Sequence, residues 1–389
     1  MKKNIFTAIL LSLCIFTFAK SSFNGFAGAS LDIVPKTPKG IELKANGLFY
    51  GQYNLNKNFN INGHFIVQTE DITKFGLFKD TEALFSIEEL SATYRFYSTS
   101  MSQQASVFIG NFESFGADSF VKKYFGTTNF ASPILTINNG TSTVGMFDFS
   151  GLGLSYSIKL EKPIAFGLYG YFDKKGSLNN INTDLRFAAA FEYLVIDFDF
   201  GISLPIEKKD DNGNDVFALI RRVDFHGGMS LLLGNNPITN LFMQVGILKL
   251  QGKPFPDTKV VSLSDLYIYM EPRFSTEFLK CNIAFFCLPE QILPELKFIN
   301  KPLGVNLTLQ TQPMSIFSKV GEIGCHVTAD TSLDFANFNI KNLEFQVSPF
   351  ITFNTNGGTL DITALFYPLL YKNLSKFMSF SIGYKTYLW

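Results

Sequence analysis

The chain has 389 residues, which is enough for one large domain or two ordinary ones. Only 17% of these residues are charged, against roughly 25% in an average soluble domain. Phenylalanine alone accounts for 44 of the 389 residues. Bases and acids balance at 33 each, so the sequence has no strongly basic surface for nucleic acid. An aromatic excess with little charge favours a surface that faces lipid, with aromatic girdles at its edges.

The N-terminus has the pattern of an export signal. Two lysines precede an uninterrupted apolar run, Ile5–Ala19, and this run is too short to span a bilayer comfortably, since about 20 residues are needed. We therefore predict that residues 1–19 are a signal peptide. A cut after Ala29, which lies in an A-x-A sequence, is the alternative. Residues 20–389 form a single domain in this interpretation.

After the signal, apolar and polar residues alternate with the period of a β-strand. The clearest segments lie near 41–53, 59–68, 88–97, 104–112, 152–160, 184–194, 196–205, 219–233, 264–276, 303–311, 320–329, 343–353 and 378–389. Each has roughly the 9–11 residues that a tilted membrane strand requires. In hydrocarbon every backbone N–H and C=O must be paired within the protein, so exported amphipathic strands predict a barrel without edges.

We predict an all-β fold, a transmembrane antiparallel β-barrel of about 16–18 strands. Eighteen is the favoured number, and the C-terminal strand closes the ring by pairing with the first strand. Short links alternate with longer ones along the chain, but the alternation slips by one strand between residues 131 and 175. The candidate segments make an odd total, whereas bacterial barrels normally have an even number of strands. One assignment in that region must therefore be wrong.

The chain ends in "FMSFSIGYKTYLW", with Tyr387 two residues before the terminal Trp389. A last strand that ends in aromatic residues resembles the assembly signal of bacterial outer-membrane barrels. This resemblance implies a location in the bacterial outer membrane. It also implies outer-membrane lipid and the barrel-assembly machinery as partners, and leaves a homo-oligomer open.

Residues 107–158 contain "VFIGNFESFGADSF", an irregular stretch, and then "STVGMFDFSGLGLSYSI". This order is similar to the fifth strand, the inward-folded third loop and the next hairpin of general porins. The resemblance implies that residues 113–140 form a loop that narrows the barrel. The low-charge style, rich in Phe, Asn and Lys, also resembles spirochaete outer-membrane proteins, which include porins for small organic anions.

The polar faces of the predicted strands carry charges that point into the barrel. The bases are Arg95, Arg186, Arg222 and Arg273, and the acids are Glu192, Asp224, Glu271, Glu322 and Glu344. A barrel this wide encloses water, so charged side chains are tolerated there and not on the lipid face. The set is either a generic polar lining or a selectivity ladder in which bases and acids face each other across the pore.

If residues 113–140 fold into the barrel, Lys122 and Lys123 come close to Arg95 and Arg186. Bases in a confined passage attract anions more strongly than bases on an open surface. The hypothesis is then a preference for small organic acids such as dicarboxylates. The rival interpretation is an external loop with solvated lysines.

The sequence shows no pattern typical of catalysis or metal binding, so we predict no enzyme activity, no metal and no cofactor. His64, His226 and His326 are isolated and are interpreted as polar residues of the lumen. Cys281, Cys287 and Cys325 are interpreted as small apolar residues, although Cys281 and Cys287 could meet across a hairpin.

Three classes of function compete. The favoured one is a porin through which small hydrophilic solutes diffuse passively. The second is a barrel transporter for hydrophobic compounds, which requires an N-terminal hatch and an apolar interior, and residues 20–40 look too short for such a hatch. The third is a surface adhesin or structural outer-membrane protein, which requires long external loops, whereas most loops here are modest.

Overall fold

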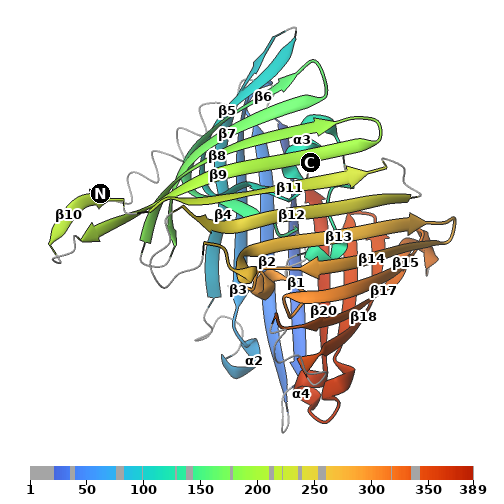
Figure 1. Ribbon diagram of the computed structural model, residues 1–389. Coiled ribbons are helices and arrows are strands. Elements are labelled where there is room, and N and C mark those ends of the chain that lie inside the picture. The colour runs from blue at the N-terminus through green and yellow to red at the C-terminus, as the bar shows by residue number, and fades with distance from the viewer. Residues whose placement is uncertain are drawn as a thin grey trace.

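A computed structural model of the protein describes residues 22–388 (Figure 1). The gaps within this range are 36–39, 76–82, 99, 128, 137–142, 176–177, 210–213, 221, 235–238, 253–259, 317 and 334–341. The predicted signal peptide, 1–19, and Trp389 of the predicted assembly signal lie outside the described residues. No helix among the described residues is long and apolar enough to cross a membrane.

Eighteen strands form the wall of the barrel, counted over the part of the chain that the structure describes. In chain order they are β1 (Ser22–Pro35), β2 (Ile41–Asn54), β3 (Phe59–Thr69), β4 (Ala83–Tyr97), β5 (Met101–Phe115), β6 (Phe147–Leu160), β7 (Ile164–Lys175), β8 (Leu178–Ala190), β9 (Leu194–Lys209), β11 (Asp224–Leu233), β12 (Thr239–Gln251), β13 (Leu266–Ser275), β14 (Leu279–Cys287), β15 (Leu303–Thr311), β17 (Lys319–Thr331), β18 (Glu344–Thr355), β19 (Gly358–Phe366) and β20 (Met378–Leu388).

The remaining elements are short. Two strands, β10 (Asp215–Leu219) and β16 (Met314–Ile316), pair with the ends of β9 and β17. The helical turns are α2 (Ile72–Phe75), α3 (Ser119–Phe125), η1 (Pro133–Leu135), η2 (Leu263–Asp265), η3 (Leu293–Glu295), η5 (Pro368–Leu370) and α4 (Leu374–Phe377).

The ring is closed by its last strand. Every wall strand pairs antiparallel with the next one, and β20 then pairs with β1 from Gly25↔Leu388 to Ile33↔Phe380. Figure 1 shows the result, with the blue β1 and β2 beside the red β20. The predicted fold class, the favoured strand number and closure by the C-terminal strand are all confirmed.

The two rims of the barrel differ in their connections. We call the rim with short links the turn rim; its links include 55–58, 98–100, 161–163, 191–193 and 276–278. We call the opposite rim the loop rim, and its connections include the long segments 116–146 and 288–302. Both described ends of the chain, Ser22 and Leu388, lie at the turn rim, because β1 and β20 begin and end there.

The structure differs from the predicted strand pattern in one detail. Between residues 131 and 146, where the link alternation slips, the described residues form only η1 and an isolated bridge from Thr136 to Thr143. The strand predicted near 184–194 ends at Ala190, and Glu192 therefore lies in the exposed turn 191–193 and not on the inner wall.

The wall strands turn apolar residues outward and polar residues inward. On β5 and β6 the outward set includes Val107, Ile109, Leu152 and Leu154, all more than half exposed. Their neighbours Ser106 and Ser155 are buried on the inner face. On the outer face, a row of phenylalanine rings, Phe23, Phe49, Phe65 and Phe85, stacks across β1–β4 with centroids 5.9–6.3 Å apart.

Many of the other aromatic residues lie inside the barrel, not on the lipid face. Their rings form a buried core with the loop segments 116–146 and 288–302. The core contains Phe108, Phe112, Phe115, Phe120, Phe130, Phe149, Tyr169, Tyr171, Phe242, Tyr267, Tyr269, Phe286 and Phe298. The phenylalanine excess that the sequence analysis assigned to lipid contact is thus divided between two surfaces.

The assignment of residues to the outer and inner faces can be tested with two neighbouring residues on β20. Ile382 is 40% exposed on the outer face, whereas Ser381 faces the lumen directly across from Asp32 of β1. We expect Ile382→Arg to cost roughly 2–4 kcal/mol of free energy of folding into bilayers, because it places a charge in hydrocarbon. Ser381→Arg should cost far less, because water and a carboxylate face it. Urea titration in lipid vesicles measures both; equal costs would contradict the assigned phase.

Candidate functional site

Two loops from the loop rim fold into the barrel and divide its interior. The first, residues 116–146, carries α3 and η1, and the second, residues 288–302, carries η3. Described residues of the first loop, such as Phe120 and Phe130, are buried in the core inside the wall. Thr128 and residues 137–140 of the predicted loop 113–140 lie outside the described residues.

The first loop begins at a kink in β5. The pairing of β5 with β6 shifts register between Phe112 and Phe115, and Glu113 has a backbone φ of 46°. A positive φ is strained for a residue with a side chain. Here the kink turns the Glu113 carbonyl oxygen toward Arg186, whose Nη1 donates to it at 2.6 Å.

Arg186 of β8 is completely buried beneath this loop. Its Nε and Nη2 donate to the two carboxylate oxygens of Asp197 at 3.0 and 2.7 Å. The guanidinium carbon also lies 4.4 Å from the ring centroid of Phe120, in α3. A guanidinium that is bonded on both edges and stacked on a ring is a structural anchor. Arg186 faces inward as expected, but it has no surface in the water path.

Further side chains of the wall hold the loop by its main chain. Nε2 of Gln244, on β12, donates to the carbonyl oxygen of Gly116 at 2.6 Å. Arg273, on β13, donates from Nη1 to the carbonyl of Asn129 at 2.6 Å and from Nη2 to that of Ala131 at 2.7 Å. The Nε of Arg273 donates to Glu271 at 2.5 Å. Arg273 and Glu271 were expected to line the pore, and the structure gives both an anchoring position.

The second loop is held by β17. Asp330 accepts hydrogen bonds from the backbone N–H groups of Asn300 and Lys301 at 2.8 and 3.1 Å. The Thr328 hydroxyl donates to the carbonyl of Phe298 at 2.9 Å, and the Phe298 ring lies 4.2 Å from the His326 ring. Both loops are thus fixed by buried polar groups of the wall.

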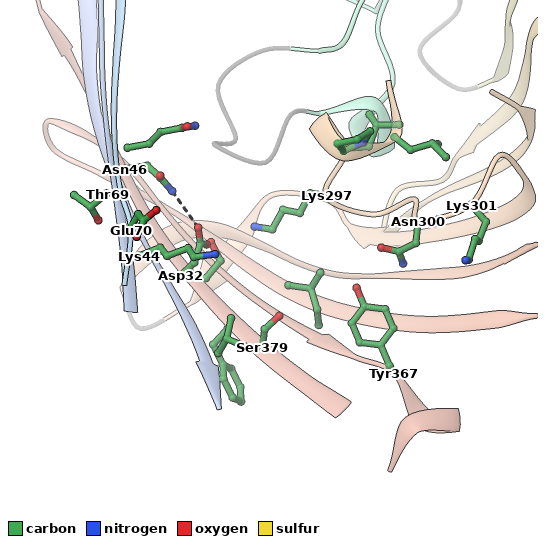
Figure 2. Close-up of a pocket in the computed structure, with 18 of the residues that line it drawn as sticks. Asp32, Lys44, Asn46, Thr69, Glu70, Lys297, Asn300, Lys301, Tyr367 and Ser379 are labelled. Carbon is green, nitrogen blue, oxygen red and sulfur yellow. Dashed lines mark hydrogen bonds between the residues drawn. The ribbon is translucent and has the colours of Figure 1, made fainter. Parts of the chain in front are cut away.

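Among the cavities formed by described residues, three lie beside the loops. The outer cavity, about 1130 Å³, lies towards the loop rim between β1–β3, β20 and the second loop, and Figure 2 shows its lining. In that view Asp32, Lys44 and Glu70 lie on one side, with Lys297, Asn300 and Lys301 on the other. The central cavity, about 540 Å³, adjoins the inner cavity, about 560 Å³, because they share lining residues such as Tyr50 and Lys122.

The charges of these cavities differ. In the outer cavity three acids, Asp32, Glu70 and Glu290, face three bases, Lys44, Lys297 and Lys301. In the central cavity the acids are Glu88, Glu89, Glu113, Asp118, Asp148 and Glu295, whereas the bases are only Lys122 and Lys385. The inner cavity adds Arg95 and Lys123. Acidic groups therefore predominate in the middle of the lumen.

A bulge in β4 places two consecutive carboxylates in the central cavity. His64 pairs with Glu89 and Phe65 pairs with Ile87, so Glu88 is the extra residue of the bulge. In a regular strand neighbours point to opposite faces, and a bulge locally breaks that rule. Both Glu88 and Glu89 consequently line the lumen.

The loop residue Glu295 faces the same cavity from the opposite side. Burial raises the pKa of Glu295, and the nearby carboxylates of Asp148 and Glu88 raise it further. In the outer cavity, burial lowers the pKa of Lys297. The carboxylates of Asp148 and Glu88 therefore repel that of Glu295 electrostatically.

The two lysines of α3 lie in the lumen but next to acids. Lys123 forms an ion pair with Glu113, and Lys122 lies 4.0 Å from Asp118. Arg95 lines the inner cavity near them. The acids that accompany these bases are not apparent from the sequence, because most of them come from the bulge and from the loops.

The other predicted charges lie away from the central cavity. Oδ2 of Asp224 forms ion pairs with Nε of Arg222 at 3.3 Å and with Nζ of Lys249 at 3.7 Å. Glu344 pairs with Lys301, and Glu322 pairs with Lys280 at 3.0 Å.

The buried anchor gives a stability prediction. Arg186→Met leaves the carboxylate of Asp197 buried without its partner, which should cost about 3–5 kcal/mol of unfolding free energy. The double variant Arg186→Met/Asp197→Leu should recover much of this, because the Asp197 carboxylate is then no longer buried without its partner. Arg222→Met, at a partly exposed pair, serves as the control and should cost about 0–1 kcal/mol. Urea unfolding in detergent measures all three; equal losses for the single and double variants would contradict the anchor.

No protein-family model matches the sequence, and no curated protein matches it. Among solved structures, the chain is similar to Salmonella typhi OmpF in complex with daunomycin, at 11% sequence identity and a TM-score of 0.42, with 95% of this chain and 97% of that chain covered. It is also similar to a triple mutant of the Rhodopseudomonas blastica porin, at 9% identity and a TM-score of 0.45, with 95% and 100% covered. Both likenesses are loose, so the fold assignment rests on the strand pairing of this chain.

Proposed function

We propose that this protein is an outer-membrane porin through which small hydrophilic solutes diffuse passively. The observation that carries the proposal is a closed barrel whose interior keeps cavities lined with charged groups beside two inward loops. Its apolar outer face suits a bilayer, and its lumen suits water. Passive diffusion requires no catalytic group, so we propose no enzyme activity.

The strand bounds support one processing site over the other. β1 begins at Ser22 and already contains Ala29. Cleavage after Ala19 would leave β1 complete, whereas cleavage after Ala29 would remove its first half and weaken its pairing with β20. We propose cleavage after Ala19.

The charges of the central cavity favour cations over anions. The sequence alone suggested the opposite, on the basis of Lys122 and Lys123, but each of these bases lies beside a carboxylate. The acids at Glu88 and Glu295 add to the negative side. In a confined lumen such an excess raises the local concentration of cations. We therefore propose a preference for small cationic or neutral solutes.

The alternative functions have less support. A transporter for hydrophobic compounds needs an apolar path, whereas each of the three cavities has charged side chains in its lining. An adhesin would present its long loops outside, but the segments 116–146 and 288–302 lie within the barrel and pack into its core.

Planar-bilayer recording tests the channel itself. Purified protein, shown to be folded by heat-modifiable gel mobility, should give stepwise currents whose conductance rises with salt concentration. Folded protein that produces no such currents would contradict the proposed function.

The ion preference is tested by reversal potentials in a KCl gradient. The wild-type channel should favour K⁺, and the double variant Glu88→Gln/Glu295→Gln should shift the reversal potential toward that of Cl⁻. Acidification should shift it the same way, because the raised pKa of Glu295 makes its carboxylate protonate early as the pH falls. Glu277→Gln, in the exposed turn 276–278, is the control and should change nothing. A wild-type preference for Cl⁻ would contradict the acidic cavity as the selecting site.

A further inference from the structure

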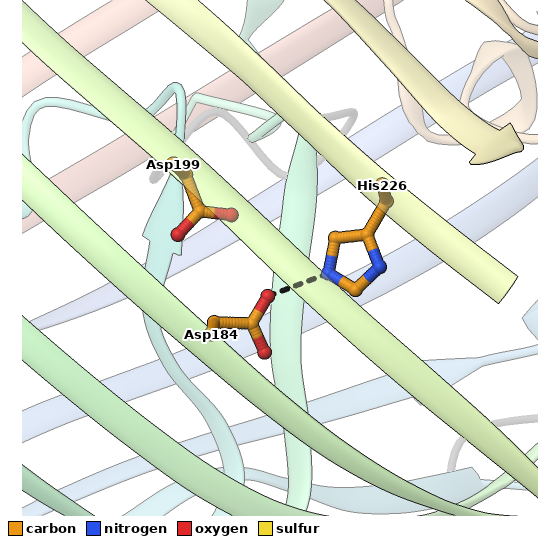
Figure 3. A group of neighbouring side chains, drawn as sticks. All are labelled: Asp184, Asp199 and His226. Carbon is orange, nitrogen blue, oxygen red and sulfur yellow. Dashed lines mark hydrogen bonds and ion pairs between the residues drawn. The ribbon is translucent and has the colours of Figure 1, made fainter. Parts of the chain in front are cut away.

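Three neighbouring strands bring together a group of side chains that channel function does not use. Asp184 of β8, Asp199 of β9 and His226 of β11 point to one place on the inner wall (Figure 3). Their potential ligand atoms all lie within 4.8 Å of one another. Asp184 and Asp199 are 0% exposed and His226 is 8% exposed, so the group is shielded from water.

A glycine makes room for this group. Gly201 of β9 pairs with Asp184 on one side and with His226 on the other. A Cβ atom at Gly201 would lie 2.1 Å from Oδ1 of Asp184 and 2.1 Å from Nε2 of His226. Any other residue at position 201 would therefore fill the space between the two side chains.

Few donors reach the carboxylates of this group. The Tyr171 hydroxyl lies beside Asp184, and Asp184 and Asp199 are close enough to share a proton. Apart from these contacts, both oxygens of Asp199 and Oδ2 of Asp184 have no hydrogen-bond partner among the described residues. One bond within the group joins Nε2 of His226 to Oδ1 of Asp184 at 2.5 Å, the dashed line in Figure 3. Buried carboxylate oxygens are normally satisfied by hydrogen bonds, by a cation or by a metal ion.

The local charges do not balance. Arg186 lies near Asp199, but its guanidinium is already bonded to both oxygens of Asp197. With all three ionised, the carboxylates of Asp184, Asp197 and Asp199 share one guanidinium, and two negative charges remain. One divalent cation would neutralise them.

We propose that Asp184, Asp199 and His226 bind a divalent transition-metal ion, with Zn²⁺ as the best match. One imidazole nitrogen and two carboxylates are a ligand set that Zn²⁺ accepts, and imidazole disfavours Mg²⁺ and Ca²⁺. An ion about 2.1 Å from each ligand atom allows up to roughly 4.2 Å between two of them. Small side-chain rotations bring the three atoms into that range, and the His226–Asp184 hydrogen bond then gives way to the ion.

The surroundings give this ion a structural role. The ring of Phe147, at the start of β6, lies 4.8 Å from the His226 ring and 6.2 Å from the ring of Phe115. The ion would join β8, β9 and β11 beneath the first loop, next to the Arg186 anchor. A metal that binds the folded chain and not the unfolded chain raises the stability of the fold.

The test uses the full-length mature protein refolded in detergent with Zn²⁺, with Mn²⁺, or with a chelator. After free ion is removed by gel filtration, elemental analysis gives the metal content per chain, and thermal unfolding gives the stability. Refolding with Co²⁺ adds a visible absorption band that reports on ligands directly. Asp199→Asn keeps the shape of the side chain but removes its charge, and Gly201→Ala fills the space between the ligands. Glu277→Gln, in an exposed turn, is the matched control.

We expect the wild type and Glu277→Gln to retain about one Zn²⁺ per chain and to unfold at a higher temperature with Zn²⁺ than with chelator. Asp199→Asn should retain little or none and should show no such difference, while it still runs as a folded, heat-modifiable barrel. Gly201→Ala, if folded, should behave in the same way. The proposal would be overturned if the folded wild type retained no ion after refolding with Zn²⁺ or Mn²⁺, which would indicate a shared proton. It would also be overturned if Asp199→Asn retained as much Zn²⁺ as the wild type.

Discussion

The pairing of backbone N–H and C=O groups around a complete ring is the constraint on which the rest of this structure depends. A strand with one unpaired edge is unfavourable in hydrocarbon, so the bonds between β20 and β1 are as necessary as those within any hairpin. Once the ring is closed, every wall strand has an outer face and an inner face. Loop residues pack against one part of the inner face, and cavities lie against another part.

One part of the inner wall is packed as a core, and another part lines cavities. Along β5–β8 and β12–β14 the inner wall carries aromatic rings and buried polar anchors, and it packs as the core of a soluble domain would. Along β1–β4 and β20 the inner wall carries groups such as Asp32, Asn46 and Glu89 that line the cavities. Because the loops fill one part, the charges of the other part stand close together, and their balance can select ions.

The alternation of the sequence was sufficient to predict the barrel, its closure and the side to which most residues point. Around Arg95 the alternation applies, because β4 is regular there, and Arg95 lines the inner cavity. Alternation could not place Glu88 and Glu89 on the same side of the wall, because a bulge inserts an extra residue without a distinctive sequence pattern. Alternation also extended the β8 segment to Glu192, where the chain has already entered a turn.

The roles of the arginines depend on contacts that no local pattern contains. Arg273 holds Asn129 across 144 positions of the chain, and Arg186 holds Glu113 across 73. Such long-range contacts appear only when the loop has been placed. For the same reason His226 seemed isolated in the sequence, although the pairing of β8, β9 and β11 brings it beside two aspartates.

The first loop is held in part through its main chain. Glu113, Gly116, Asn129 and Ala131 each offer a carbonyl oxygen to a side chain of the wall, and every residue type has that oxygen. The path of the loop is therefore insulated from many substitutions at its lumen-facing positions, such as Lys122 and Asp118. Descendants of this gene could exchange those residues and change the charge of the lumen while the loop keeps its path.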